Sequence, residues 1–250
     1  MKHDTVICLP ARYQSTRLPG KPLIKIAGKE LILWALQSAS QITAKHILVA
    51  TDDERIAQLV QKHGYEAIMT AKNHKTGTDR LAEVAEILQL SDDTIVVNYQ
   101  ADEPLTPKAN IQQLIDALIH NPQADIATLF QPCQDFDELI NPNNVKLITD
   151  NDGFALYFSR SALPYSQAFF EQQKLDDSIT YKHHVGLYAY RAGFLKKFSK
   201  LQQTALEKTE SLEQLRALSN GFKIIAKAAK EKMPHGIDTP EDLRKFQHQH

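Results

Sequence analysis

A regular alternation of two hydrophobic patterns constrains the fold of this chain more than any other feature of its sequence. Short apolar runs that favour β-strands recur in the first half, at residues 6–9, 47–50, 67–69 and 95–97. Helical patterns lie between them, at residues 30–40, at positions 56, 59 and 60 after the capping-box sequence Thr51-Asp52-Asp53-Glu54, and at positions 81, 84, 85 and 88. Because strands that alternate with helices pair in parallel through right-handed crossovers, the sequence predicts an α/β fold around a mostly parallel sheet.

The second half of the chain alternates less regularly. We expect strands at residues 125–130, 145–148, 155–159, 184–190 and 223–226, and a helix at residues 211–218. No internal repeat or low-complexity linker divides the chain. The pattern therefore predicts a single α/β domain over residues 1–250, with a smaller lobe inserted around residues 130–220. Because ligands of such sheets bind outside the carboxyl ends of the strands, the loops that follow the strands are the candidate sites.

The composition excludes several classes of protein. Hydrophobic residues make up 42% and charged residues 24% of the 250 residues, which is ordinary for a globular protein and excludes a disordered or collagen-like chain. The best candidate for a membrane span, residues 31–36, is much shorter than the roughly 18 residues required. The first residues lack the apolar region of a signal peptide. We therefore expect a cytoplasmic protein without a membrane span.

Charge and cysteine content narrow the field further. The formal net charge of −1 disfavours a protein that wraps long nucleic acid, although it is compatible with a local basic pocket. The two cysteines, Cys8 and Cys133, can build neither a disulfide framework nor a cysteine zinc site. Cys8 lies within the apolar run Val6-Ile7-Cys8-Leu9, so we expect a buried strand cysteine there and not a nucleophile.

The loop after the first predicted strand, residues 10–23, carries three cations: Arg12, Arg17 and Lys21. Arginine grips phosphate oxygens with a bidentate fork, lysine adds a compact charge, and Gly20 lets the backbone approach a ligand closely. The loop matches neither the Walker A pattern nor the dinucleotide-binding glycine pattern. Its composition alone favours a solvated surface loop, but its place at the end of a strand favours a binding site for a nucleotide polyphosphate.

The sequence Thr76-Gly77-Thr78-Asp79-Arg80 comes before the helical stripe that starts at residue 81. Hydroxyl residues and a glycine at a helix start can present backbone N–H groups to an anion or a base. Ordinary capping of the helix explains the same residues equally well. The sequence alone does not decide between the two interpretations.

Two acidic residues far apart in the sequence stand in favourable places for a metal ion. Asp102 follows the apolar run at residues 95–97, and Asp238 precedes Thr239 and Pro240, which fit the cap and the first position of a helix. A turn or a cap explains each carboxylate alone at least as well. Together with a basic phosphate loop they indicate metal-assisted phosphoryl chemistry, because Mg²⁺ prefers one or two carboxylates together with substrate phosphates.

Motifs along nearly the whole chain carry a resemblance to a known family. The first is the loop from Pro10-Ala11-Arg12 to Lys21-Pro22-Leu23. The others follow in the order Ala50-Thr51-Asp52, Gly77-Thr78-Asp79-Arg80-Leu81, Asn98-Tyr99-Gln100-Ala101-Asp102-Glu103-Pro104, Tyr157-Phe158-Ser159-Arg160, His184-Val185-Gly186-Leu187-Tyr188, Leu212-Glu213-Gln214-Leu215-Arg216 and Gly236-Ile237-Asp238-Thr239-Pro240-Glu241-Asp242-Leu243. These motifs resemble the sugar-activating cytidylyltransferases, and among them the 3-deoxy-manno-octulosonate (Kdo) cytidylyltransferases.

The resemblance implies a Rossmann-like nucleotide-diphospho-sugar transferase fold and the reaction CTP + Kdo → CMP-Kdo + diphosphate for lipopolysaccharide biosynthesis. It also implies Mg²⁺ as cofactor and a homodimer, with the lobe around residues 130–220 serving substrate and dimer contacts. The catalytic residues that it implies are Arg12 and Lys21 on the CTP phosphates and Asp102 and Asp238 on magnesium. The nucleotide-binding residues that it implies are Ala11, Arg12, Lys21, Thr76, Gly77, Arg80, Gln100 and Asp102. The sugar-binding residues that it implies are Gln100, Arg160, His184, Tyr188, Glu213 and Gln214.

The chemistry of the sugar-site residues agrees with these roles but also has simpler explanations. Arg160 can pair with the carboxylate of an acidic sugar, and the other side chains can bond to hydroxyl groups. Glu213 and Gln214 also fit the solvated face of a helix. His184 and Tyr188, four residues apart on one side of a strand, also fit strand packing.

Three residues depart from the family pattern, and several other functions stay open. Ala101 stands where the family pattern has glycine, and alanine restricts positive φ. His183 stands where the pattern has arginine, so the charge at that position depends on pH. Thr76 stands where the pattern has serine. These departures bear on substrate choice and rate more than on the class of reaction. The alternatives are a cytidylyltransferase for another acidic ketosugar (8-amino-Kdo or sialic acid), a catalytically silent nucleotide-binding homologue, and an RNA-binding module that uses the basic loop.

Overall fold

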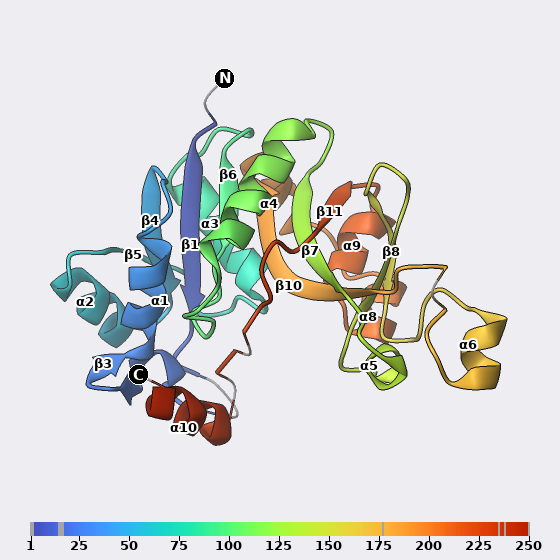
Figure 1. The fold of residues 1–250 in the computed structure, drawn as a ribbon. Helices are drawn as coiled ribbons and strands as arrows, with labels where there is room; N and C mark the ends of the chain where they lie inside the picture. The colour runs from blue at the N-terminus through green and yellow to red at the C-terminus, as the bar shows by residue number, and fades with distance from the viewer. Residues whose placement is uncertain (1–2, 15–17, 177, 235, 238, 250) are drawn as a thin grey trace.

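The first predicted strand forms β1 (Thr5–Ala11), an inner strand of the central sheet in a computed structural model (Figure 1). The structure describes residues 3–14, 18–176, 178–234, 236–237 and 239–249, and only the backbone of residues 168–170, 240 and 248–249. β1 pairs in parallel with β4 (His46–Thr51) and β6 (Ile95–Asn98), and β4 pairs in parallel with β5 (Glu66–Met69). The four apolar runs of the first half thus form a parallel sheet, which confirms the predicted alternation.

Helices cover both faces of this parallel part, because alternate residues of a strand point to opposite faces. Ile7 and Leu9 of β1 belong to the core on one face, and Val6 and Cys8 belong to the core on the other. Burial raises the pKa of the Cys8 thiol, so the predicted buried strand cysteine is confirmed. The first face is covered by α1 (Leu31–Ala39), α2 (Glu54–Lys62) and α4 (Lys108–His120), and the second by α3 (Gly77–Ile87) and α7 (Ala192–Phe198).

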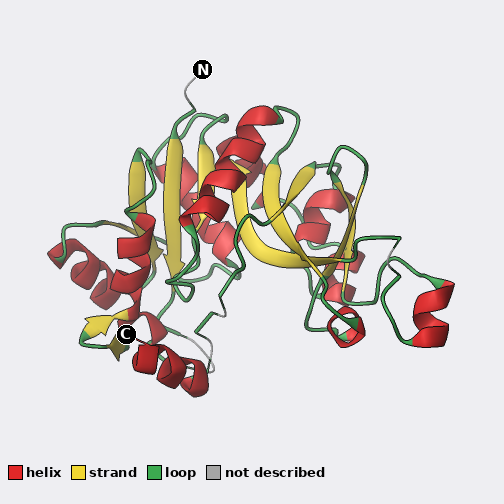
Figure 2. Ribbon diagram, in the orientation of Figure 1, coloured by secondary structure: helices red, strands yellow, loops and turns green. Residues whose placement is uncertain are grey.

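The second half of the chain adds antiparallel strands to the same sheet. β10 (Lys182–Arg191) pairs antiparallel with β6 and with β7 (Ile126–Pro132), and β11 (Ile224–Ala228) pairs in parallel with β7 at the sheet edge. The register of β10 shifts between Val185 and Tyr188, and the strand curves away from the main sheet (Figure 2). Beyond the curve β10 pairs with β8 (Lys146–Thr149), which pairs with β9 (Ala155–Ser159). The described residues form nine strands in this sheet.

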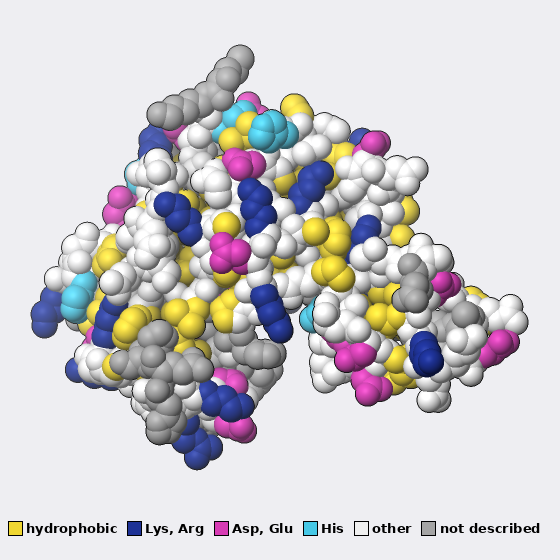
Figure 3. All heavy atoms as spheres, viewed as in Figure 1, with side chains coloured by type: hydrophobic (Ala, Val, Ile, Leu, Met, Phe, Trp, Pro, Cys, Tyr) yellow, Lys and Arg dark blue, Asp and Glu magenta, His cyan; other side chains and the backbone are white. Residues whose placement is uncertain are grey.

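β8 and β9 belong to a lobe that projects beside the main body (Figure 1). The lobe also contains the short helices α5 (Phe136–Ile140) and α6 (Gln167–Gln172). The space-filled surface is notched between the lobe and the main body (Figure 3). The helices α8 (Ala205–Glu210) and α9 (Gln214–Ser219) follow α7. Because α7 packs against α3, that part of the predicted lobe around residues 130–220 lies on the main body.

Two helices start later than the sequence predicted. α2 begins after Asp53, whose side chain caps it, and not after Thr51, because Thr51 is still paired within β4. α9 begins at Gln214 and not near Ser211, because Ser211 has a φ of 53° and ends α8. α10 (Pro240–Gln249) starts as predicted, with the Thr239 hydroxyl accepting a hydrogen bond from the first turn. None of the described helices is long and apolar enough to cross a membrane.

Candidate active site

The loop after β1 lies against the start of α3. Arg12 Nη2 donates a hydrogen bond of 2.7 Å to the carbonyl oxygen of Lys75. A Cβ on Gly77, the first residue of α3, would lie 3.4 Å from the Pro10 side chain, so the two segments are in close contact. Ala11 is buried at the end of β1. The structure therefore brings the basic motif and the hydroxyl-glycine motif together at the carboxyl end of β1.

Lys21 meets the acidic loop that follows β6. It begins the short 3-10 helix η1 (Lys21–Leu23), directly after Gly20, whose φ of 68° favours glycine. Lys21 Nζ lies 2.6 Å from Asp102 Oδ2, although the two residues are 81 positions apart in the sequence. The cation expected on phosphate and the carboxylate expected on magnesium thus form an ion pair. Arg17, the third predicted cation, lies outside the described residues.

The backbone of Asp102 is also hydrogen-bonded to the C-terminal segment, whose sequence includes the second predicted carboxylate. The backbone N–H of Ile237 donates a 2.9 Å hydrogen bond to the carbonyl oxygen of Asp102. Asp238, the next residue, lies outside the described residues. In the part of the chain that the structure describes, no three His, Cys, Asp or Glu side chains gather as a metal site. The hard carboxylate of Asp102 fits Mg²⁺, which needs only one or two protein carboxylates when phosphates and waters complete its shell.

Capping accounts for part of the motif at the start of α3. Thr76 Oγ1 accepts a hydrogen bond from the Asp79 N–H, and Asp79 Oδ2 accepts one from the Thr76 N–H, both at 3.2 Å. This reciprocal pair is a capping box. Gly77 and Thr78 instead line a cavity. The capping interpretation is therefore confirmed, and the binding of an anion or a base at this helix start stays a prediction.

Arg80 occupies a different place from the one expected for a nucleotide ligand. Its side chain is completely buried, with Nη2 donating to Asp52 at 3.1 Å and Nη1 donating to the Thr70 hydroxyl. A guanidinium enclosed in this way cannot touch a ligand in this conformation. Arg80 therefore stands behind the site, where it ties α3 to the segments after β4 and β5.

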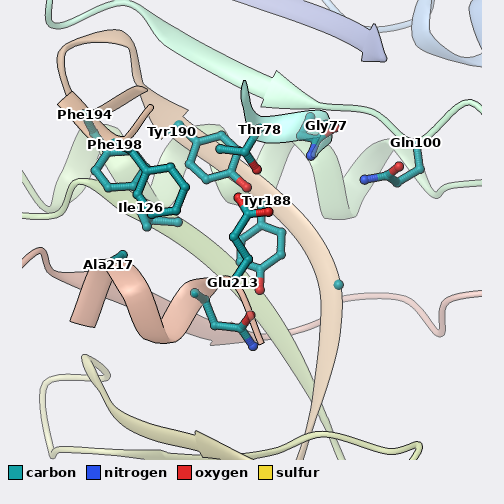
Figure 4. A pocket seen from close by; sticks show the side chains of 13 residues that line it. Gly77, Thr78, Gln100, Ile126, Tyr188, Tyr190, Phe194, Phe198, Glu213 and Ala217 are labelled. Carbon is teal, nitrogen blue, oxygen red and sulfur yellow. The ribbon is translucent and has the colours of Figure 1, made fainter. Parts of the chain in front are cut away.

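A cavity of about 210 Å³ lies between the start of α3, β10 and α9 (Figure 4). Five residues predicted for the site line it: Gly77, Gln100, Tyr188, Glu213 and Gln214. Gln100 stands at one end and Phe194 and Phe198 at the other, with Tyr188 and Glu213 between them (Figure 4). Gln100 precedes Asp102 by two residues, so one loop both lines the cavity and carries the carboxylate that pairs with Lys21.

Glu213 is the carboxylate of this cavity lining. Burial raises the pKa of Glu213, and the hydroxyl groups of Thr78 and Thr76 and the charge of Arg216 offset only part of that rise. Burial likewise raises the pKa of Tyr188 and Tyr190, so both phenols stay neutral at physiological pH. The cavity wall therefore offers several hydrogen-bond partners and a single carboxyl group, a set that suits a polyhydroxylated ligand.

His184 stands behind the cavity wall. Its ring lies edge-on to Phe158 at 5.0 Å and 5.3 Å from the ring of Tyr188. His184 Nε2 is 3.0 Å from the Thr128 hydroxyl. Burial, helped by the charge of His183, lowers the pKa of His184 to about 3. His184 is therefore a neutral ring that packs against Tyr188, and the expected adjacency of the two side chains is confirmed.

Arg160 lies at the base of the lobe and not in the cavity lining. Its Nε donates a hydrogen bond of 2.8 Å to the carbonyl oxygen of Glu210, and its Nη1 donates one of 2.9 Å to the carbonyl oxygen of Pro142. The Glu210 carboxylate accepts hydrogen bonds from the Arg160 N–H and from the Ser159 hydroxyl. Two of the five N–H donors of the guanidinium are used in this way.

The cavity also has members to which the sequence analysis assigned no role, although Thr78, Asn98 and Gly186 stand within motifs that it quoted. They are Thr78, Asn98, Ile126, Gly186, Tyr190, Phe194, Phe198 and Ala217. Strand periodicity could have found Tyr190, because it stands two residues from Tyr188 and their rings stack at 5.7 Å. No local signal marks Ile126 or Ala217, which reach the cavity only through packing.

Comparison with known proteins identifies a family. The family model described as "Cytidylyltransferase" matches residues 6–225. A protein of Pseudomonas fluorescens named 3-deoxy-manno-octulosonate cytidylyltransferase is 49% identical over 247 residues, which cover 98% of this chain and 97% of that protein. A protein of the same name from Vibrio vulnificus is 47% identical over 237 residues, which cover 95% of this chain and 94% of that protein.

Solved structures give the same answer. A CMP:2-keto-3-deoxy-manno-octonic acid synthetase complexed with CTP superposes with a TM-score of 0.88 at 38% identity, covering 98% of both chains. This likeness confirms the predicted α/β nucleotide-sugar transferase fold. A cytidylyltransferase from Leptospira borgpetersenii superposes with a TM-score of 0.63 at 16% identity, covering 98% of this chain and 86% of the other, and shares the fold.

Proposed function

Because the chain belongs to the 3-deoxy-manno-octulosonate cytidylyltransferase family, we propose that it catalyses CTP + Kdo → CMP-Kdo + diphosphate. The reaction activates the sugar for lipopolysaccharide biosynthesis in the cytoplasm. The observation that supports the proposal best is the continuity of the Gln100–Asp102 loop. One end of this loop lines a polar cavity and the other pairs with the cation of the phosphate loop, as a joint sugar and nucleotide site requires.

The phosphates of CTP bind to the cations around the end of β1. Arg12 holds Lys75 through one N–H group, and an arginine has further donors for phosphate oxygens. Lys21, which forms a 2.6 Å ion pair with Asp102 in this structure, pairs with a phosphate instead when CTP binds. Asp102, together with Asp238, would hold magnesium, which when bound would offset the charge of the triphosphate. The backbone N–H of Gly77 and the amide of Gln100 complete the nucleotide contacts, and Thr76, whose N–H and hydroxyl serve the capping box, shapes the start of α3 beside them.

The sugar binds in the cavity of Gln100, Tyr188, Glu213 and Gln214. These side chains contact its hydroxyl groups, and His184 keeps Tyr188 in place. Arg160 pairs with the sugar carboxylate through donors that the Pro142 and Glu210 carbonyl groups do not occupy.

The chemical step needs no protein nucleophile. The C2 hydroxyl of Kdo attacks the α-phosphorus of CTP in line, an O–P bond forms, and the bond from that phosphorus to diphosphate breaks. The hydroxyl proton leaves to solvent. Arg12 and Lys21 stabilise the charge that develops on the phosphate oxygens and on the leaving diphosphate.

Release of diphosphate from CTP tests the proposal. The complete mixture of protein, CTP, Kdo and Mg²⁺ should release diphosphate and form a CMP-sugar, and each omission should abolish release. Release with sialic acid or 8-amino-Kdo but not with Kdo would change the substrate. Binding of CTP without release for any of these sugars would favour a catalytically silent homologue.

The protein also forms a homodimer in this proposal. Apolar side chains stand exposed on and beside the lobe, among them Leu156 at 60% and Tyr165 at 71% of their full exposure. Only a contiguous apolar patch indicates a surface that another chain covers, so the homodimer rests on the family resemblance. Light scattering after size exclusion should give twice the mass of 28.2 kDa, and a single-chain mass would contradict the dimer.

A further inference from the structure

A small apolar cluster fixes the C-terminal helix α10 to the rest of the protein, apart from the two cores that line the sheet. Its buried members are Ile26, Leu31, Ile237 and Phe246, and Trp34 and Leu243 pack against them. The ring of Phe246 meets the ring of Trp34 edge-on, with 5.9 Å between centroids. α10 is otherwise polar, so its docking depends on these few contacts.

The cluster is joined to the acidic loop of the site. Ile237 is a buried member of the cluster, and its N–H donates the 2.9 Å hydrogen bond to the Asp102 carbonyl oxygen. Gly236 lies against the same loop, since a Cβ there would be 3.4 Å from Glu103 Cγ. The docked C-terminal segment therefore braces the backbone of the residue expected to hold magnesium.

The same cluster also supports Lys21, the partner of Asp102. η1, which Lys21 begins, is separated from β2 (Lys25–Ile26) by Ile24 alone, and Ile26 is a buried member of the cluster. Trp34 Nε1 donates a 3.1 Å hydrogen bond to the Ile26 carbonyl oxygen. The cluster thus contacts both segments whose charged side chains meet at 2.6 Å.

We propose that the contact between Phe246 and Trp34 positions the nucleotide site. Docking of α10 holds the Asp102 loop and the Lys21 segment in the relative positions that CTP binding requires. The inference rests on the proposed function for the identity of the ligand. Coupling between two such contacts is reciprocal, so docking favours CTP binding and CTP binding favours docking.

Trp34 is the sole tryptophan of the sequence, so its fluorescence reports on α10 directly. Phe246→Ala should shift its emission to longer wavelength, because water replaces the ring of Phe246. The same variant should bind CTP in Mg²⁺ about tenfold more weakly by calorimetry, within the range of ordinary couplings. Saturating CTP should move the emission of the variant back toward that of the wild type. Phe246→Leu should recover most of the CTP affinity.

The control is Gln247→Ala, which changes the exposed neighbour on the same helix and should alter neither emission nor affinity. If Phe246→Ala does not fold, Leu243→Ala removes a less buried contact of the same cluster and replaces it in the test. A variant with shifted emission and wild-type CTP affinity would overturn the inference, as would unchanged emission. A wild-type protein that does not bind CTP would overturn the proposed function and the inference with it.

Discussion

The buried ion pair between Glu207 and Arg216 holds the helix that presents Glu213 to the cavity. The side chains of Arg216 and Glu207 are only 6% and 5% exposed, and two hydrogen bonds of 2.6 and 2.8 Å join them. Burial raises the pKa of Glu207, but the hydrogen bond and charge of Arg216 outweigh it, and the pKa lies below its ordinary value. Breaking this pair should therefore destabilise the fold on the sugar side of the site.

Glu207→Gln keeps the shape of the side chain but removes the counter-charge to which the buried guanidinium of Arg216 is hydrogen-bonded, leaving only the charges of Glu213 and Asp79 near it. Removal of one partner of a buried pair costs about 3–5 kcal/mol. At roughly 2–4 °C per kcal/mol for a chain of this size, the Tm should fall by about 6–20 °C. Urea unfolding followed by circular dichroism and thermal unfolding measure the loss.

Two further variants and the pH dependence make this prediction refutable. Replacing both partners, as in Glu207→Leu with Arg216→Met, should recover much of the loss, because no charge is then left buried alone. Glu241→Gln breaks an exposed pair with Lys245 and should leave the midpoint unchanged. Because the folded pKa of Glu207 is depressed, its stabilisation is present above the unfolded pKa and is lost as pH falls through the folded value. The difference between wild type and Glu207→Gln should therefore shrink below the ordinary glutamate pKa of about 4.3 and vanish below the depressed folded pKa. A loss under about 1 kcal/mol at neutral pH would refute the reasoning, since it falls below the range for a buried pair.

Three other substitutions test separate parts of the structure. Asp102→Asn should lower kcat at least about 100-fold at saturating Mg²⁺, and near-normal turnover would contradict its role in holding the metal. Glu213→Gln should raise the KM for Kdo roughly tenfold and leave that for CTP unchanged, since a hydrogen bond to a charged group contributes about 1.5–3 kcal/mol; equal changes in both constants would argue against a sugar contact. Gly193→Ala should cost about 1–3 kcal/mol in urea unfolding. The reason is that its Cβ would come within 2.8 Å of Asp92 Cβ, so a variant of wild-type stability would be inconsistent with this packing.

The parallel part of the sheet was predictable because its inner strands are buried on both faces. β1, β4 and β6 are apolar almost throughout, and the helical stripes between them are equally plain. The curved course of β10 was not predictable, because its register shift depends on pairing with β7 and β8 and leaves no periodic mark in the sequence.

The candidate site was predictable at the level of single loops and less so at the level of contacts. The residue types of the phosphate loop and of the Asp102 loop indicated binding of phosphate and of a metal ion. The 2.6 Å ion pair between Lys21 and Asp102 was not predictable, because it depends on β1 and β6 being neighbours in the sheet. Arg80 shows the limit of such inference. A cation in such a motif indicates a ligand contact, yet Asp52 and Thr70, which belong to other segments of the chain, accept hydrogen bonds from the buried Arg80 guanidinium.

The alanine at position 101 adopts its place without backbone strain. Ala101 is not among the described residues with positive φ, so the departure from glycine does not force a left-handed conformation. Its methyl group is buried and belongs to the core on the α1 and α4 face of the sheet. Ala101→Gly should therefore lower stability, by about 0.4–1 kcal/mol from the added freedom of the unfolded chain and somewhat more from the lost methyl contacts.

The same change should leave turnover unaffected, because the methyl group packs into the core and does not line the cavity. Urea unfolding and diphosphate release measure the two effects on one preparation. Ala127→Gly, on the same core but within β7, is the matched control and should lose stability in the same direction. If Ala101→Gly were instead more stable than the wild type, or several-fold faster, the methyl group would be hindering the Asp102 loop, which would contradict its favourable packing in the core.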